Sequence, residues 1–459
     1  MKNAWLKYNE EDIKNIDLLC DNYKNFITNN KTEREIVSEI ENKVLESGFK
    51  SLDYYIDKNS LNVGDKVYVN NMNKAIALFV IGEDDITKSG MNILGAHIDS
   101  PRLDIKQNPL YEDNNFAYLD THYYGGIKKY QWTALPLALH GVVVKKDGSI
   151  INIKIGEDIT DPVVGITDLL PHLAQEQMKK NASVFVDAEN LDILVGSKLI
   201  KTEKDEKDCV KKNILKILKD KYNIIEDDFL SAEIEVVPAG PARDFGLDRS
   251  MIMAYGQDDK VCAFTSLEAF LNVDSCKKTI SCILVDKEEI GSVGATGMES
   301  CFYEHAVSEI AMLLGHNYPT ALYRIFKNSN MLSSDVNAGY DPLYKEVMEK
   351  NNASYLGNGM AFCKFTGSRG KSGANDANPE YIAHLRDILD KENIAFQISE
   401  LGKVDVGGGG TIAYILANKN INVIDCGVAV LSMHAPWEVT SKADIYEAYK
   451  GYKVFLRDA

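Results

Sequence analysis

The sequence predicts an α/β protein: a layered domain with a mostly parallel sheet, interrupted by an inserted β-rich domain. Two observations lead to this fold class. Strand and helix patterns alternate both in the first hundred residues and again from residue 261 onward, whereas the stretch between them is rich in strand patterns and turn signals. Because the outer parts share the same alternation of strand and helix patterns, we expect residues 1–104 and 243–459 to form one domain, with residues 105–242 inserted into it.

The first part begins with helices and continues with strands. Apolar residues recur at helical spacing in residues 4–48, and Thr32-Glu33 is a helix-start signal within that stretch. Two strand patterns in residues 66–82 flank the turn Met72-Asn73, which predicts a β-hairpin. Residues 91–100, MNILGAHIDS, are typical of a buried strand that ends in polar residues.

The middle and last parts differ in their patterns. The middle contains short strands separated by turn signals such as Lys146-Asp147-Gly148, and one amphipathic helix over residues 207–224. Helical periodicity returns at residues 261–273, followed by the strand KTISCILVD (278–286) and a helix over 298–315. The same alternation continues through the rest of the chain, as expected for a layered α/β domain.

Composition excludes several classes of protein. The 459 residues are 45% hydrophobic and 26% charged, which is typical of a soluble globular protein. A formal charge of −17 argues against nucleic acid as a partner, because phosphate binding needs a basic surface. The polar N-terminus shows no secretory signal and no long apolar run predicts a membrane span, so we expect a cytoplasmic protein without a membrane partner. Eight scattered cysteines without a CxxC pair predict reduced thiols, mostly in the core.

Several predicted strands of the α/β part end in metal-binding residue types. Ligands of open α/β sheets gather outside the carboxyl ends of the strands. The polar residues found there, or just before a helix, are His97, Asp99, Asp258, Asp259, Glu288, Glu289, Asp335 and His434. Taken singly, each has a structural explanation as a loop hydrogen bond, a turn or a helix cap. Taken together, imidazoles and carboxylates at separate strand ends predict a site for zinc or a similar divalent ion.

Two local patterns sharpen this prediction. His97 and Asp99 are two residues apart, so on a strand they project to one face; Asp99 then either orients the imidazole or binds the metal itself. Glu288 and Glu289 are neighbours, and on an extended backbone their side chains diverge. One glutamate can therefore bind metal while the other takes a proton from an activated water. The pattern alone does not decide which glutamate has which role.

Five motifs in order along the chain carry a family resemblance. They are GAHIDSPRL (95–103), GQDDKVCAF (256–264), DKEEIGS (286–292), SSD (333–335) and LSMHAP (431–436), supported by YYGGIKKYQW (123–132) and LPHLAQE (170–176). The chain resembles the aspartyl aminopeptidase/aminopeptidase I family of zinc metallopeptidases over nearly its whole length. The bacterial branch known as probable aminopeptidase I is the most similar.

The resemblance implies a cocatalytic two-metal site and a role for each candidate residue. His97 and Asp335 would bind one metal, Asp258 would bridge both, and Glu289 and His434 would bind the other. Glu288 would be the general base, with Asp99 as the partner of His97. Zinc is the implied metal, and manganese or cobalt accepts the same ligands.

The resemblance also implies an oligomeric assembly and two residues that contact the substrate. His172 would reach into the active site of a neighbouring subunit, and Lys364 would be a basic residue beside the substrate. The inserted β-rich domain would be a dimerisation domain of a homo-oligomer, a particle of twelve subunits.

Two departures from the family pattern bear on specificity. Ala338 replaces a histidine of the aspartyl branch, and Lys371 replaces a tyrosine. We therefore expect an aminopeptidase that acts on peptides with neutral or apolar N-terminal residues. The alternatives are an acidic-residue-specific aminopeptidase, a related two-metal carboxypeptidase or deacylase, and an inactive particle-forming, metal-binding scaffold.

Overall fold

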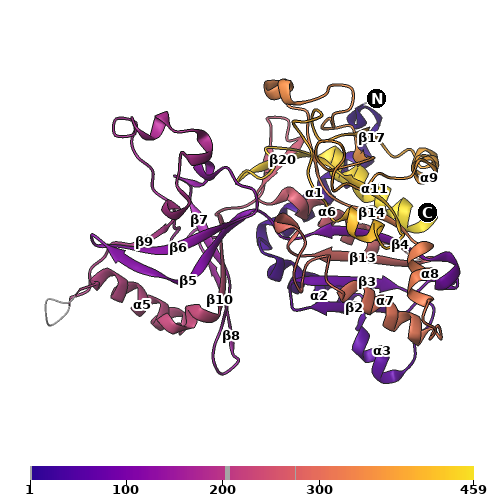
Figure 1. Cartoon of the computed structure of the whole chain (residues 1–459), viewed down its shortest axis with the longest axis horizontal. Coiled ribbons are helices and arrows are strands. Elements are labelled where there is room, and N and C mark those ends of the chain that lie inside the picture. Colours follow the sequence, from indigo (N-terminus) through magenta and orange to yellow (C-terminus); the bar gives the residue numbers. More distant parts are fainter. Residues whose placement is uncertain (1–2, 202–206, 274) are drawn as a thin grey trace. The chain divides into compact units, whose positions relative to one another are not determined.

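A computed structural model describes residues 3–201, 207–273 and 275–459, and the chain forms two compact units within it (Figure 1). The first unit comprises Met1–Asp99, Ala242–Met433 and Glu438–Ala459, and the second comprises Ser100–Pro241 and His434–Trp437. Among the described residues, no helix is long and apolar enough to cross a membrane. All eight cysteines belong to the described part of the chain and are free thiols, five of them buried, as predicted.

A nine-stranded mixed sheet is the centre of the first unit. Its order is β1 (Lys50–Ser51), β2 (Lys66–Asn71), β3 (Ala75–Val80), β13 (Thr279–Val285), β4 (Met91–His97), β14 (Asn330–Ser333), β18 (Asn422–Gly427), β16 (Met360–Cys363) and β17 (Phe396–Ser399). The central strands β13, β4, β14 and β18 are parallel, and β2, β3, β13, β4 and β14 lie side by side in Figure 1. The predicted hairpin of β2 and β3 is present, with Met72 and Asn73 at positive φ.

Helices cover both faces of this sheet. Successive residues of a strand point to opposite faces, so the strands contribute to two separate apolar clusters. Leu94 and Ala96 of β4 belong to one apolar cluster, whereas Met91 and Ile93 belong to a second. The first cluster includes residues of α1 (Glu10–Asn29), α2 (Glu33–Glu46), α6 (Gln257–Leu271), α9 (Pro379–Lys391) and α11 (Lys442–Asp458). The second includes residues of α3 (Leu52–Lys58), α4 (Ile86–Ser89), α7 (Phe302–Leu313), α8 (Ala321–Lys327) and α10 (Ala413–Ala417). The predicted α/β class is confirmed.

Smaller elements complete the first unit. A five-stranded sheet has the order β11 (Arg243–Phe245), β12 (Met251–Ala254), β20 (Glu438–Ser441), β19 (Ala429–Leu431) and β15 (Asn337–Ala338). Three short 3₁₀ helices are η1 (Ala4–Lys7), η7 (Glu288–Ile290) and η8 (Pro342–Val347). The predicted helix start before α2 is correct, because the Thr32 side chain accepts the Glu35 N–H in a capping box.

The second unit is built on an antiparallel six-stranded sheet. Its order is β8 (Ile150–Ile155), β7 (Leu137–Val144), β10 (Ala232–Pro238), β5 (Arg102–Asp113), β6 (Phe116–Tyr124) and β9 (Ile193–Gly196). The predicted amphipathic helix is α5 (Cys209–Tyr222), which contacts β5, β6 and β9. Five 3₁₀ helices are η2 (Lys129–Trp132), η3 (Gln177–Lys179), η4 (Ala182–Val184), η5 (Ala188–Asn190) and η6 (Glu226–Ser231).

Candidate metal centre

Three neighbouring parallel strands of the first unit end at one edge of its large sheet. β4 ends at His97, and His97 pairs in register with Val285, the last residue of β13. On the other side of β4, β14 ends at Ser333. Asp335 and Glu288 follow these strand ends within a few residues. The parallel register therefore brings candidate ligands from distant parts of the sequence to one edge of the sheet.

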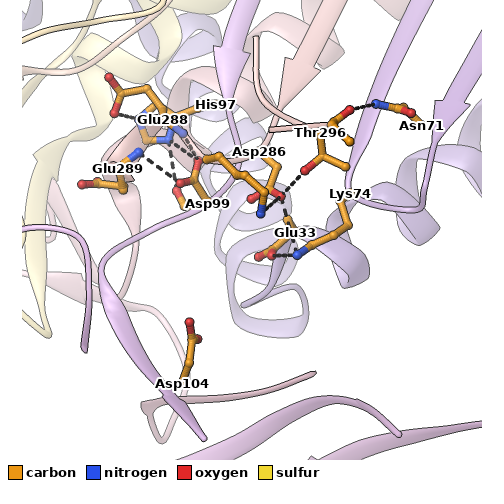
Figure 2. A network of polar contacts seen from close by, with 12 residues as sticks. Glu33, Asn71, Lys74, His97, Asp99, Asp104, Asp286, Glu288, Glu289 and Thr296 are labelled. Atoms are coloured by element: carbon orange, nitrogen blue, oxygen red, sulfur yellow. Dashed lines mark hydrogen bonds and ion pairs between the residues drawn. The ribbon is translucent and has the colours of Figure 1, made fainter. Parts of the chain in front are cut away.

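The His97 side chain is buried among carboxylates. Its exposed fraction is 1%, and its Nδ1 lies 3.2 Å from Asp99 Oδ1. Its Nε2 lies 3.1 Å from Asp258 Oδ1 and 3.9 Å from Glu288 Oε2. Figure 2 shows the Asp99 and Glu288 side chains on either side of the imidazole. The predicted contact between His97 and Asp99 is therefore present, and it leaves Nε2 facing the candidate ligands.

Asp258 lies at the start of α6, where the backbone is not helical. Its φ is −80° and its ψ is 105°, and its peptide bond to Asp259 is cis. The Asp258 N–H donates to Glu438 Oε2 at 3.1 Å, and Gln257 Nε2 donates to the Glu438 carbonyl at 2.6 Å. Glu438 is 1% exposed, and its two hydrogen bonds stabilise the loop of Gln257 and Asp258. Sequence reasoning missed Glu438, because it opens β20 rather than ending a strand.

Glu288 and Glu289 lie in a tight turn, so the expected extended backbone is wrong. Lys287 adopts the left-handed conformation at φ 69°, and the glutamates then form the 3₁₀ helix η7. Their N–H groups donate to Asp99 Oδ1 and Oδ2, each at 3.1 Å. Because a 3₁₀ helix has three residues per turn, neighbouring side chains still diverge by about 120°. The inference that the two carboxylates face different directions therefore survives for a different reason.

Among the described residues of the first unit, the ligand atoms around His97 form two overlapping groups. One nitrogen of His97 and one oxygen each of Asp258 and Asp335 all lie within 4.8 Å of one another. His97, Glu288 and Glu289 meet the same criterion. The structure thus gathers four predicted carboxylates of the first unit, those of Asp258, Glu288, Glu289 and Asp335, around the His97 imidazole, with Asp99 on its other nitrogen. Both glutamates lie within this range, so the arrangement is compatible with either one as the ligand.

The site concentrates negative charge in a buried place. Burial raises the pKa of Asp335 well above its usual value, and the nearby Asp259 adds to this effect. Burial likewise raises the pKa of Asp259, with Asp258 reinforcing it and His97 opposing it. Burial favours neutral His97, but its hydrogen bonds to Asp258 and Asp99 outweigh that effect and raise the His97 pKa. A divalent cation would relieve this repulsion, and one imidazole with several carboxylates is a donor set that zinc accepts.

His434 belongs to the short segment His434–Trp437, which groups with the second unit. Its Nδ1 lies 2.9 Å from the Gly126 carbonyl oxygen, and its φ is 63°. A carbonyl accepts only from a protonated nitrogen, so this contact fixes the proton on Nδ1 and leaves the lone pair on Nε2. That tautomer is suited to metal binding through Nε2.

The two predicted substrate residues lie in more open surroundings. His172 is exposed in a turn of the second unit that precedes η3. Lys364 directly follows β16 in the first unit and forms an ion pair with Asp376. Lys371 pairs with the same carboxylate, with its Nζ 2.9 Å from Asp376 Oδ2. Neither His172 nor Lys364 belongs to the two ligand groups around His97.

Buried imidazole and carboxylates at the carboxyl edge of an α/β sheet are the donor set expected of a metal-dependent enzyme. Comparison with known proteins identifies the family. The model of the aminopeptidase I zinc metalloproteases (M18) matches residues 26–456, and the chain belongs to this family. It is a metalloaminopeptidase, and the family uses zinc.

Relatives match over nearly the full length. The probable M18 family aminopeptidase 1 of Clostridium acetobutylicum is 58% identical, covering 100% of this chain and 98% of the relative. The crystal structure of the M18 family aminopeptidase from Thermotoga maritima has 45% identity and a TM-score of 0.95, covering 100% and 99% of the two chains. The S. cerevisiae mApe1 dodecamer has 20% identity and a TM-score of 0.77 over 96% and 97%, which establishes a shared fold only.

Proposed function

We propose that this chain is a two-metal aminopeptidase that removes neutral or apolar N-terminal residues from peptides. The observation that carries the proposal is the buried group of imidazole and carboxylate ligands around His97. In it, one imidazole nitrogen faces Asp99 while the other faces Asp258 and Glu288. This is the arrangement of a histidine that an outer carboxylate orients toward a metal.

In this proposal the ligands would divide between two ions. His97 and Asp335 would hold the first, Asp258 would contribute to both, and Glu289 and His434 would hold the second. The 4.8 Å group of His97, Asp258 and Asp335 supports the first set. The Nδ1 contact of His434 with Gly126 supports the second, because it presents the Nε2 lone pair for coordination.

The chain's own residues orient and move protons in this reaction. Zinc, when bound, polarises the scissile carbonyl and acidifies the attacking water. Glu288 takes the proton of that water and delivers it to the leaving amine, while Asp99 fixes both the imidazole and the glutamate N–H groups. His172 of a neighbouring copy donates to the developing negative charge on the carbonyl oxygen.

The surroundings of Lys364 support a preference for uncharged N-terminal residues. Asp376 pairs with both Lys364 and Lys371, so its carboxylate compensates one of their two positive charges. Ala338 has no polar side chain to add to these lysines. An acidic side chain of the substrate would therefore meet less positive charge there than two unpaired lysines would offer.

We further propose that the second unit mediates self-association and that the complete particle is a dodecamer, as in the S. cerevisiae structure. Apolar side chains are unusually exposed in its segment 159–184. Ile159 is fully exposed, and Leu173 and Met178 are 69% and 67% exposed. Several exposed apolar side chains in one segment favour a protein contact, and His172 lies in the same segment.

Glu288→Gln tests the base assignment. The variant retains the wild-type zinc content, because Glu288 is not a ligand in this account, and its turnover of leucine p-nitroanilide falls by about a thousandfold. Turnover near the wild-type rate would refute the assignment. Loss of zinc in the same variant would instead make Glu288 the ligand.

A substrate panel tests the reaction class. Leucine and alanine p-nitroanilides are cleaved faster than those of aspartate and glutamate, and N-acetylation of the substrate abolishes cleavage. A strong preference for acidic residues would indicate an acidic-residue-specific aminopeptidase. Cleavage of the acetylated substrates would point to a deacylase or carboxypeptidase. A protein that binds zinc but cleaves no substrate of the panel would be an inactive scaffold.

A further inference from the structure

The turn that carries Glu288 and Glu289 has little apolar packing to hold it. Glu288, Glu289 and Ile290 are all partly exposed, and Ile290 is 45% exposed. The backbone reverses through left-handed residues on both sides, at Lys287 and Gly291. The position of the turn therefore depends on polar contacts made by its neighbours.

Asp286 supplies such contacts at the base of the turn. It directly follows β13, and its side chain is completely buried. Thr296 Oγ1 donates to Asp286 Oδ2 at 2.7 Å, and the Lys287 ammonium lies 3.1 Å from the same oxygen. The Asp286 N–H also donates to the Thr296 carbonyl at 3.3 Å. Asp286 and Thr296 thus join the two arms of the loop between β13 and α7.

Lys74 links this loop to a second part of the first unit. It follows the Met72-Asn73 turn, and its side chain is 9% exposed. Its Nζ lies 3.1 Å from Glu33 Oε1 and 3.6 Å from Asp286 Oδ2. Glu33 is the first residue of α2 and its side chain is completely buried. Figure 2 shows Lys74 between Glu33 and Asp286, with Thr296 on the other side of Asp286.

These contacts connect Glu33, at the start of α2, with Asp286, two residues before Glu288. Two buried carboxylates of like charge would repel each other, and the ammonium between them compensates that charge. Asp286 and Glu288 are separated by one residue, and Asp99 holds the Glu288 N–H from the opposite side. The turn is therefore held at its base by Asp286 and Lys74, and at its N–H groups by Asp99.

We propose that Lys74 and Asp286 are positioning residues for Glu288, acting through the buried network of Glu33, Lys74, Asp286 and Thr296. The network has no direct contact with substrate; it fixes the turn so that the Glu288 carboxylate stays beside His97. This inference rests on the proposed role of Glu288 as the base. Loss of the Lys74 ammonium lets the turn shift, which slows proton transfer without removing a ligand.

Lys74→Met tests the proposal, because methionine keeps an unbranched side chain of similar length but removes the charge. At a temperature well below the unfolding midpoint, kcat for leucine p-nitroanilide falls about tenfold or more, while KM and zinc content stay at wild-type values. Lys74→Arg, which restores the charge, recovers most of this loss. Thr296→Val lowers kcat in the same way, and Thr296→Ser restores it.

Lys7→Met is the matched control. Lys7 Nζ also faces a fully buried carboxylate, that of Glu447 at 2.7 Å, and this variant should keep the wild-type kcat. A lower melting temperature of Lys74→Met with unchanged kcat would overturn the proposal, since that is the result of a purely structural ion pair. An equal loss of kcat in Lys7→Met would also overturn it.

Glu288→Gln, assayed in parallel, separates the two proposals. If Glu288→Gln is inactive while Lys74→Met and Thr296→Val keep the wild-type kcat, only the positioning role is refuted. If Glu288→Gln remains active, the base assignment and the positioning role that rests on it are both refuted.

Discussion

The strand-end group around His97 and the segment 159–184 of the second unit place candidate functional residues in opposite surroundings. His97 is 1% exposed and touches carboxylates from two other segments of its own chain, those of Asp258 and Glu288. His172 is exposed, and the described helices nearby are short 3₁₀ helices such as η3. A buried group already has its partners within one chain, whereas an exposed one among apolar side chains needs a second copy to acquire them. The two histidines should therefore respond differently to the same experiments.

Asp258→Asn should have the largest effect. The substitution removes a charge from the carboxylate that faces His97 Nε2 and that, in our proposal, would bind both ions. Turnover falls about a thousandfold, equivalent to about 4 kcal/mol of transition-state stabilisation, and zinc is lost with it. Enzyme assays with metal analysis measure both, and Asp57→Asn on α3 should change neither. Wild-type activity of Asp258→Asn would show that Asp258 does not bridge the metals.

His172→Ala should have a smaller effect of a different kind. Turnover falls about a hundredfold, as for the loss of one donor to an oxyanion, whereas zinc content is unchanged. Co-expression with Glu288→Gln should restore activity, because under our proposal some sites of the mixed particle would combine His172 from one subunit with Glu288 from another. His305→Ala, at another exposed histidine, should have no effect. Failure of complementation would mean that His172 acts within its own chain or not at all.

Asp444 tests whether burial alone creates a metal site. Burial raises the pKa of this carboxyl to about 8, although its oxygens accept the Gly357 and Gly359 N–H groups. A raised folded pKa stabilises the protein below the unfolded value of 3.8, and this stabilisation is lost as pH rises to about 8. The loss is about 1.4 kcal/mol per pH unit at most. Urea midpoints at pH 6 and pH 8 should therefore differ less for Asp444→Asn than for the wild type, and zinc content should not change. An equal pH dependence in both proteins would exclude this titration.

Local sequence patterns predicted the parts of the site that local geometry determines. The two-residue spacing of His97 and Asp99 was sufficient to predict their contact, and the Thr32 capping signal placed the start of α2 correctly. The backbone at Glu288 could not be predicted in this way, because the left-handed conformation of Lys287 is unusual for a residue with a side chain.

Contacts between distant segments were beyond the sequence patterns. Lys74 was noticed only as part of a hairpin, since nothing near it indicates that Glu33 and Asp286 meet at its ammonium. Glu438 accepts a hydrogen bond from the N–H of Asp258, which lies 180 residues earlier in the sequence. Such residues become visible only when the fold brings their partners together. The roles of His172 and Lys364 stay predictions, because their proposed partners are a second copy and a substrate.

The zinc content of the wild-type protein tests the central claim most directly. Purified protein dialysed against excess zinc and then against metal-free buffer should retain two zinc ions per chain, measured by mass spectrometry of the metal. Two ions agree with His97 and Asp335 holding one and Glu289 and His434 holding the other, bridged by Asp258. A single zinc ion per chain in fully active protein would contradict the two-metal site.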